Sequence, residues 1–120
     1  MNLVLIHGRL TRDPEVKTTQ SGLMIARLTV AVDRVVKKGE ERKADFLNCV
    51  AFSHTAEVIA QYCTKGKEIV IQGRLQTSTY QTEDGEKRYK TEIIIDRFEF
   101  CGSAKDGKKA EVEAQESIPF

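Results

Sequence analysis

A stretch of strict alternation near the start of the chain constrains the fold more than any other feature. In ARLTVAVD (26–33), Ala26, Leu28, Val30 and Val32 alternate with Arg27, Thr29, Ala31 and Asp33. A period of two is typical of a β-strand whose first set of side chains faces a core and whose second set mostly faces solvent. The stretch therefore predicts a strand in a sheet that is covered on one side.

Four more segments read as strands. Residues 3–6 form a short apolar run that is closed by His7-Gly8-Arg9, which indicates a strand bent at the glycine. Residues 44–52 are apolar on both faces, so alternation alone does not decide whether Phe46 and Phe52 or Leu47 and Cys49 face the core. The remaining two strands are predicted at 67–80 and 87–101.

Turn residues separate these strands. Asp84-Gly85 between the last two segments is a strong hairpin signal, because that pair readily adopts the backbone angles of a two-residue turn. Residues 37–41 (KKGEE) read as another hairpin loop. Residues 11–22 are polar and rich in turn-forming residues, so they are predicted to be a loop.

One helix is predicted, beginning at residue 53 and continuing through VIAQYC. Ala56, Ile59 and Cys63 recur at helical spacing, and Ser53 or Thr55 can cap the first turn. Gly66 is a suitable stop signal. Five strands with a helix between the third and the fourth predict an all-β fold, a five-stranded Greek-key barrel of the OB type.

The character of the chain changes after residue 103. The segment SAKDGKKAEVEAQES contains a single sizeable apolar residue and cannot offset its ordering entropy, so we expect a domain at 1–103 and a disordered tail at 104–120. The last three residues, Ile118, Pro119 and Phe120, are apolar again. They read either as a frayed end or as a tip that docks on another protein.

Several function classes are disfavoured. No apolar run approaches the roughly 20 residues of a membrane span, and we expect neither a membrane partner nor secretion. Cys49, Cys63 and Cys101 are widely spaced, which favours ordinary thiols in a reducing cytoplasm over a zinc site, and no metal or cofactor is expected. No nucleophile, metalloprotease or phosphate-loop motif is present, so the chain is not expected to be an enzyme.

Aromatic and basic residues indicate a surface for a single-stranded nucleic acid, where rings stack on bases and cations follow phosphates. The net charge of only +1 means that such a surface must come from local clustering. Core packing is the alternative for each aromatic residue, and an ordinary solvated charge for each basic one. The candidates are Phe46, Phe52 and Tyr80 for stacking, and Arg34, Lys37, Asn48, Arg74, Gln76 and Arg88 for polar contacts.

The motifs together resemble a known family. VLIHGRLTRDPEVKTT is similar to the first strand and loop of bacterial single-stranded DNA-binding proteins. The segment from ADFLNCVAF through GRLQT to RYKTE is similar to the middle of the same family, and the terminal Ile-Pro-Phe matches its C-terminal tip. The resemblance extends over about residues 2–102.

The resemblance implies roles for particular residues. Phe46, Asn48 and Phe52 would face DNA, and Tyr80 would occupy a stacking position. Lys65, Arg74 and Arg88 would contact the backbone. Val36 falls near another aromatic position of the family, so one stacking platform is missing.

The function implied is sequence-independent binding and protection of single-stranded DNA in replication, recombination and repair. Partners implied are single-stranded DNA, three further copies in a homotetramer, and replication and repair proteins held by the tip. The cytoplasm, in association with the nucleoid, is the location implied. His7 stands where the family usually has an apolar residue, so the resemblance determines the assembly state less firmly than the fold. Two alternatives remain, an OB module that chiefly binds protein and RNA binding through the same face.

Overall fold

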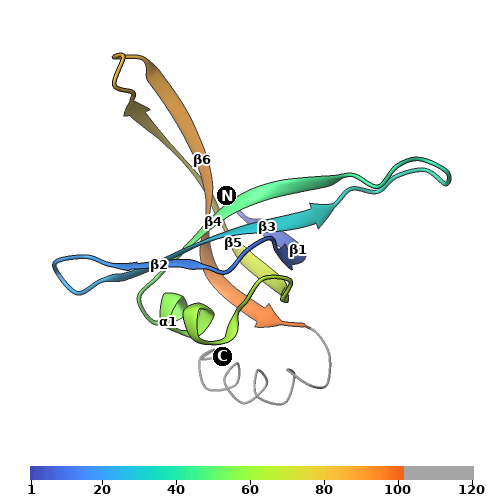
Figure 1. Cartoon of the computed structure of the whole chain (residues 1–120), viewed down its shortest axis with the longest axis horizontal. Coiled ribbons are helices and arrows are strands. Elements are labelled where there is room, and N and C mark those ends of the chain that lie inside the picture. Colours follow the sequence, from blue (N-terminus) through green and yellow to red (C-terminus); the bar gives the residue numbers. More distant parts are fainter. Residues whose placement is uncertain (102–120) are drawn as a thin grey trace.

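The computed structural model describes residues 1–101, so the predicted tail at 104–120 and its tip Ile118–Phe120 lie outside the described residues. The described chain forms six strands and one helix (Figure 1). Their bounds are β1 Val4–Leu10, β2 Glu15–Thr18, β3 Met24–Asp33, β4 Ala44–Phe52, α1 Ser53–Tyr62, β5 Glu68–Gln81 and β6 Lys87–Phe100.

Five of the strands close into a ring. The sheet runs β1-β5-β6-β4-β3, and β1 also pairs with β3 through Arg9↔Ala31 and Leu10↔Val30. All neighbouring pairs are antiparallel except β4 and β6, which run parallel. A closed five-stranded barrel with its helix between the third and fourth barrel strands is the OB-fold, so the predicted fold is confirmed.

One strand was missed. The segment Glu15–Thr18 was predicted to lie in a loop, but it forms β2 and pairs with Met24–Arg27 of β3. All four of its residues are exposed, so no alternation between buried and exposed positions could mark it. It continues the edge of β3 beyond the point where β1 pairs, and it lies outside the five-stranded ring.

The core fills the inside of the barrel. Ala26, Leu28 and Val30 are buried as predicted, whereas Val32 near the end of β3 is only half-buried. In β4 the inward residues are Cys49 and Ala51, which decides the question that alternation had left open. The other buried core residues are Leu10, Ala56, Val58, Ile59, Cys63, Ile69, Ile71, Ile93, Ile95 and Phe98.

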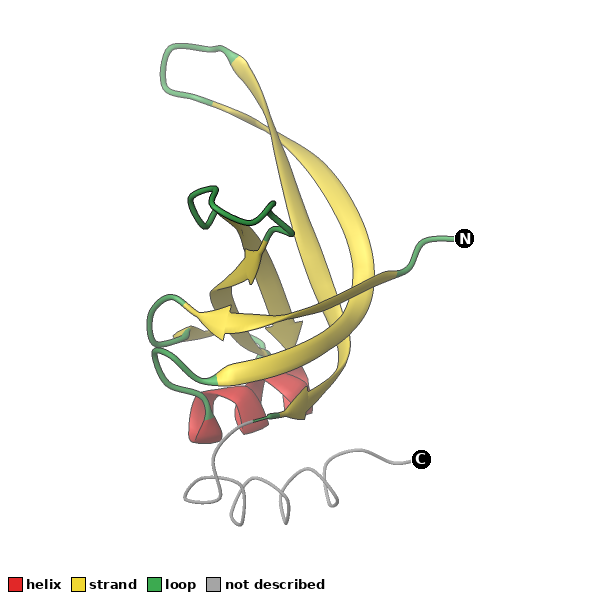
Figure 2. Cartoon of the chain, turned by 90° about the vertical axis from the view of Figure 1, so that its right-hand side faces the viewer, coloured by secondary structure: helices red, strands yellow, loops and turns green. Residues whose placement is uncertain are grey.

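Helix α1 covers one end of the barrel (Figure 2), where its buried face packs against β3 and β4. The predicted caps were wrong. Phe52 is the N-cap and no side chain caps the first turn, because Ser53 takes a left-handed φ of 58° as the chain turns out of β4. The helix ends at Tyr62, and Gly66 serves the following turn, where Lys67 N–H donates to the carbonyl of Thr64.

Two glycines allow the strands to approach closely. A Cβ atom on Gly73 would lie 2.1 Å from the carbonyl oxygen of Ile94, and one on Gly8 would lie 2.3 Å from that of Ala31. The register of β5 against β6 also shifts between Gln72 and Gly73. Strand β1 pairs with β5 as far as Gly73, and β4 pairs with β6 at Ile93 and Ile94. Past these contacts, β5 and β6 continue alone as a long hairpin that projects from the barrel (Figure 1).

Within residues 1–101, no helix has the length and apolar character needed to cross a membrane.

Candidate nucleic-acid interface

One continuous surface is formed by the outward side chains of β3, β4, β6 and β5, in that order. Register places Ala31 beside Phe46 and Thr29 beside Asn48 across β3 and β4. Val50 lies beside Ile94 across β4 and β6. Gln76 lies beside Glu92, and Tyr80 beside Arg88, across β6 and β5. We call this surface the outer face.

The three predicted aromatic residues all lie on the outer face and are accessible. Phe46 is 66% exposed, Tyr80 is 52% exposed and Phe52 is 38% exposed. Core packing therefore does not account for any of the three. Phe46 and Phe52 are six residues apart on β4, while Tyr80 lies on the projecting hairpin, so the rings are spread along the face rather than gathered in a pocket.

The predicted arginines are paired with exposed carboxylates. Arg74 Nη1 lies 3.2 Å from Asp96 Oδ1, and Arg88 Nη2 lies 3.2 Å from Glu86 Oε2. Ion pairs of this exposed kind contribute about 1 kcal/mol or less, so a phosphate can replace the carboxylate at small cost. Gln76 is exposed on β5, two residues from Arg74, whereas Arg88 lies on β6.

Arg34 belongs to the arm that joins β3 to β4. Its Nε and Nη2 atoms donate to Asp45 Oδ1 at 2.9 Å and 2.7 Å. The hydrogen bond from Arg34 lowers the pKa of the Asp45 carboxyl and raises the pKa of the guanidinium. Lys37 is exposed in the same arm, next to the half-buried Val36.

Asn48 is central and exposed, and its Oδ1 accepts a hydrogen bond of 3.3 Å from Thr29 Oγ1. Lys65 is placed differently from the other candidates. It lies in the turn after α1, where its backbone N–H donates to Asp13 Oδ1 at 2.8 Å. The structure thus places all the predicted residues except Lys65 either on the outer face or in the arm between β3 and β4. Lys65 belongs to the end of the barrel that carries the helix.

A charge cluster on the outer face was not predicted. Arg27 Nη1 donates to Glu92 Oε2, and Lys90 Nζ lies 3.6 Å from Glu92 Oε1. The Glu92 side chain is only 14% exposed. Arg27 could be placed on the polar side of its strand by alternation, but its partner comes from a strand that is 65 residues further along the chain.

The floor of the outer face is apolar and buried. Val50 and Ile94 point outward, yet they are 1% and 5% exposed. They are buried outside the barrel core, beneath the longer side chains of the face. Packed residues hold side chains in few rotamers, so the groups above them are held in place before any ligand arrives.

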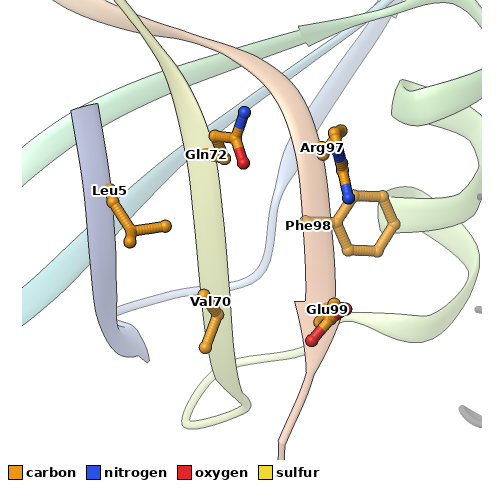
Figure 3. A pocket seen from close by; sticks show the side chains of 6 residues that line it. All are labelled: Leu5, Val70, Gln72, Arg97, Phe98 and Glu99. Atoms are coloured by element: carbon orange, nitrogen blue, oxygen red, sulfur yellow. The ribbon is translucent and has the colours of Figure 1, made fainter. Parts of the chain in front are cut away.

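A second surface lies on the β1 side of the barrel. Leu3 and Leu5 are 62% and 69% exposed there, and β1 has a strand partner on only one side from Val4 to Gly8 within the described chain. Beside Leu5 is a shallow hollow of about 170 Å³ (Figure 3). It is lined by Leu5, Val70, Gln72, Arg97, Phe98 and Glu99.

An OB barrel that presents exposed rings and cations across its strands belongs to the class of barrels that bind oligonucleotides or oligosaccharides. Comparison with known proteins narrows the class. The model of the Single-strand binding protein family matches residues 1–101, and the chain belongs to this family.

Curated relatives carry the same description. Proteins named single-stranded DNA-binding protein from Clostridium perfringens and Fusobacterium nucleatum are 44% and 49% identical to this chain, over 91% and 88% of its length. The alignments cover 71% and 69% of those proteins. A protein from Staphylococcus aureus named single-stranded DNA-binding protein 1 is 44% identical over 83% of this chain and 65% of its own length. The chain thus spans about two thirds of these relatives.

Proposed function

We propose that this protein is a non-catalytic single-stranded DNA-binding protein that coats exposed strands, without sequence preference, during replication, recombination and repair. The observation that carries the proposal is the outer face, on which Phe46, Phe52 and Tyr80 are exposed beside exchangeable arginines. Membership of the Single-strand binding protein family and the printed names of the relatives support DNA as the ligand.

Stacking supplies most of the affinity for bases. Each base that stacks on Phe46, Phe52 or Tyr80 contributes about 1–3 kcal/mol, and every base offers a flat face, so binding tolerates any sequence. Val36 is half-buried at the position where the family resemblance implies a further ring, which reduces the number of stacking platforms. We expect the same binding mode as in relatives with more aromatic residues, at lower affinity.

The strand's phosphates are held by side chains that flank the rings. Arg34, Lys37, Lys65, Arg74 and Arg88 supply cations, and Asn48 and Gln76 supply hydrogen bonds. Phosphate replaces the carboxylate partner of Arg74 or Arg88, and the released counterions make the affinity fall as salt rises. Lys65 would be reached only by bound DNA that continues around the barrel toward α1.

Assembly into a homotetramer is part of the proposal. The unpaired edge of β1 offers backbone groups from Val4 to Gly8 to a second copy. The exposed Leu3 and Leu5 and the hollow beside them give this surface apolar area to bury. Several copies joined in this way would bring several outer faces to one strand and lengthen the site.

The division of labour along the chain is also a proposal. Residues 1–103 would bind DNA, and residues 104–120 would be a flexible tail whose tip, Ile118-Pro119-Phe120, recruits replication and repair proteins. The protein would then work in the cytoplasm, at the nucleoid, where single strands are exposed.

Fluorescence anisotropy of a labelled oligo-dT tests the central claim, and the label is needed because the chain has no Trp. We expect tight binding that duplex DNA does not compete away, with log K falling by about 0.7 per neutralised phosphate per log unit of salt. A matched oligo-U competitor tests the RNA alternative. If neither oligo-dT nor oligo-U bound at low salt, the proposal would be refuted and a barrel that binds protein would be favoured.

A further inference from the structure

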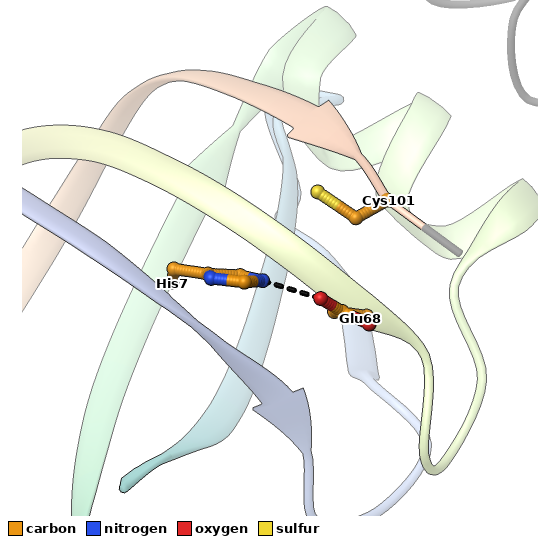
Figure 4. Close-up of side chains that lie close together, drawn as sticks. All are labelled: His7, Glu68 and Cys101. Atoms are coloured by element: carbon orange, nitrogen blue, oxygen red, sulfur yellow. Dashed lines mark hydrogen bonds and ion pairs between the residues drawn. The ribbon is translucent and has the colours of Figure 1, made fainter. Parts of the chain in front are cut away.

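Three side chains that can bind a metal meet on the β1 side of the barrel. They are His7 of β1, Glu68 of β5 and Cys101, which follows β6 (Figure 4). Their ligand atoms all lie within 4.8 Å of one another. His7 Nε2 and Glu68 Oε2 are 2.5 Å apart and share a hydrogen bond. This group contains a nitrogen, an oxygen and a sulfur donor, each from a different strand or its end.

Strand register brings the three residues together. Arg9 is the direct partner of Glu68 across β1 and β5, and His7 lies two residues away on the same side of β1. Ile69 pairs with Phe100 across β5 and β6, so Cys101 comes next to Glu68, and its N–H donates to the Glu68 carbonyl at 3.1 Å. The contacts depend on the pairing of β5 with β1 and with β6, which explains why the sequence contains no spacing typical of a metal site.

We propose that His7 Nε2, Glu68 Oε2 and Cys101 Sγ form a zinc-binding site. Tetrahedral zinc with ligand bonds of about 2.0–2.3 Å separates its ligand atoms by roughly 3.3–3.8 Å. The distance of 2.5 Å between His7 Nε2 and Glu68 Oε2 is shorter than that range, and all three ligand atoms lie within 4.8 Å of one another. Side-chain shifts of about 1 Å would therefore complete the geometry. Thiolate and imidazole donors favour zinc over magnesium or calcium, which prefer oxygen. Water completes the fourth position.

Neighbouring contacts suit the group to a cation. Arg9 Nη2 lies 3.3 Å from Glu68 Oε1, so it holds the oxygen that the metal does not use and leaves Oε2 directed at His7. On binding, zinc replaces the proton between His7 Nε2 and Glu68 Oε2, and that proton passes to His7 Nδ1 or to solvent so that a neutral imidazole binds the metal through Nε2. The Cys101 thiol releases its proton to solvent and binds as the thiolate. Second contacts of this kind typically orient the ligands of a metal site.

Cys101 is the thiol best placed to react with an ion from solvent. It is half-buried, whereas Cys49 and Cys63 are buried in the core. Burial also raises the pKa of Cys49 and of Cys63 to about 12. The group lies where β1 pairs with β5, on the side of the barrel that carries the proposed contact between copies and away from the aromatic residues of the outer face. Its zinc binding can therefore be measured separately from DNA binding.

Titration of the full chain with Co²⁺, after treatment with a chelator and a reductant, tests the site. We expect one ion per chain and an absorption band from sulfur-to-cobalt charge transfer, which Zn²⁺ then abolishes by displacement. Cys101→Ser should remove the band, and His7→Gln should weaken binding by roughly tenfold or more. His54→Gln is the matched control, because His54 Nδ1 lies 3.6 Å from Glu57 Oε2 without belonging to a three-ligand group in residues 1–101.

Two results would overturn the site. The first is the absence of a sulfur-to-cobalt band from the unaltered chain. The second is a band that persists in Cys101→Ser or that is lost equally in His54→Gln. Circular dichroism confirms that each variant is folded, and oligo-dT binding by the same samples reports the outer face separately. A chain that binds DNA without binding zinc would refute only this inference.

Discussion

Arg27 of β3 and Glu92 of β6 join their side chains across β4, the strand that lies between them. Arg27 is the register partner of Val50, and Val50 is the register partner of Ile94, two residues from Glu92. The ion pair therefore spans the apolar floor of the outer face. Lys90, on the same strand as Glu92, lies near the other oxygen of that carboxylate, with its Nζ atom 3.6 Å from Glu92 Oε1. One acidic group is thus shared by two cations on the surface proposed to hold phosphates.

Glu92→Gln should tighten DNA binding several-fold and steepen its salt dependence, because Arg27 and Lys90 become available to phosphates. The free energy of unfolding should fall by about 1 kcal/mol, since the pair is lost. Anisotropy at two salt concentrations and urea denaturation measure the two effects. Glu57→Gln on α1 is the control and should change neither. Weaker DNA binding by Glu92→Gln would mean that Glu92 positions Arg27 instead of competing with DNA.

Phe46→Ala and Tyr80→Ala should each weaken oligo-dT binding at least tenfold, because about 1–3 kcal/mol of stacking is lost per base. Both residues are exposed, so the fold should be retained. Tyr89→Ala provides a matched control. Tyr89 is 78% exposed but pairs with Thr79, and so points to the opposite side of the same hairpin from Tyr80. Equal losses from Tyr80→Ala and Tyr89→Ala would contradict the assignment of stacking to the outer face.

The three thiols should react in a fixed order with a disulfide reagent in the metal-free protein. The pKa of Cys49 and of Cys63 is raised to about 12 by burial, so neither forms the reactive thiolate near neutral pH. Cys101 should react first. Burial also raises the pKa of Cys101 above the ordinary value of a thiol, so its rate should still increase as the pH rises through the alkaline range. If the folded protein reacted with more than one equivalent of the disulfide reagent per chain, a buried thiol would have reacted, and the core must open.

Gly73→Ala should destabilise the barrel by about 2–3 kcal/mol, because the added Cβ would collide with the carbonyl of Ile94 and nothing flexible can move aside. Gly85→Ala is a useful comparison. Gly85 has a φ of 84°, and a Cβ atom added there would meet no other atom within 4 Å. The cost of Gly85→Ala is therefore only conformational, about 1–2 kcal/mol. Denaturation by urea ranks the two variants, and the reverse order would contradict the close approach at Gly73.

Deletion of Ile118–Phe120 should leave oligo-dT affinity unchanged and abolish recruitment of replication and repair proteins. The proposed DNA-binding residues all lie within residues 34–88, far from the tip in sequence. Pull-down of replication and repair proteins from a bacterial extract, with and without the tip, measures the effect. A truncated chain that retains those partners would refute the role of the tip.

Local patterns predicted much of the fold. The predicted strand at 44–52 has the bounds of β4, and Asp84-Gly85 lies in the turn between β5 and β6. Which face of β4 is inward could not be predicted by alternation, because Val50 is buried on the outward side too. It is buried there by side chains from other strands, and no pattern within β4 encodes that.

The candidate site was predictable where its residues lie on one strand and share its parity, as Arg74, Gln76 and Tyr80 do on β5. Relationships between distant strands were not. The Arg27–Glu92 pair joins residues 65 apart, and the His7–Glu68 contact joins residues 61 apart. Pairing of β3 and β6 with β4 brings the first pair together, and pairing of β1 with β5 the second. The predicted N-cap failed for a local reason, the left-handed turn at Ser53.

Closure of the ring has a consequence for how the chain is made. Strand β1 finds its main partner only when Glu68–Gly73 has been synthesised, and the parallel contact of β4 must wait for Ile93 and Ile94. Contacts between such distant segments slow folding, because a long loop must close before they form. A nascent chain of this protein therefore exposes an unpaired β1 until β5 has been synthesised, and it cannot complete the barrel before β6 has followed.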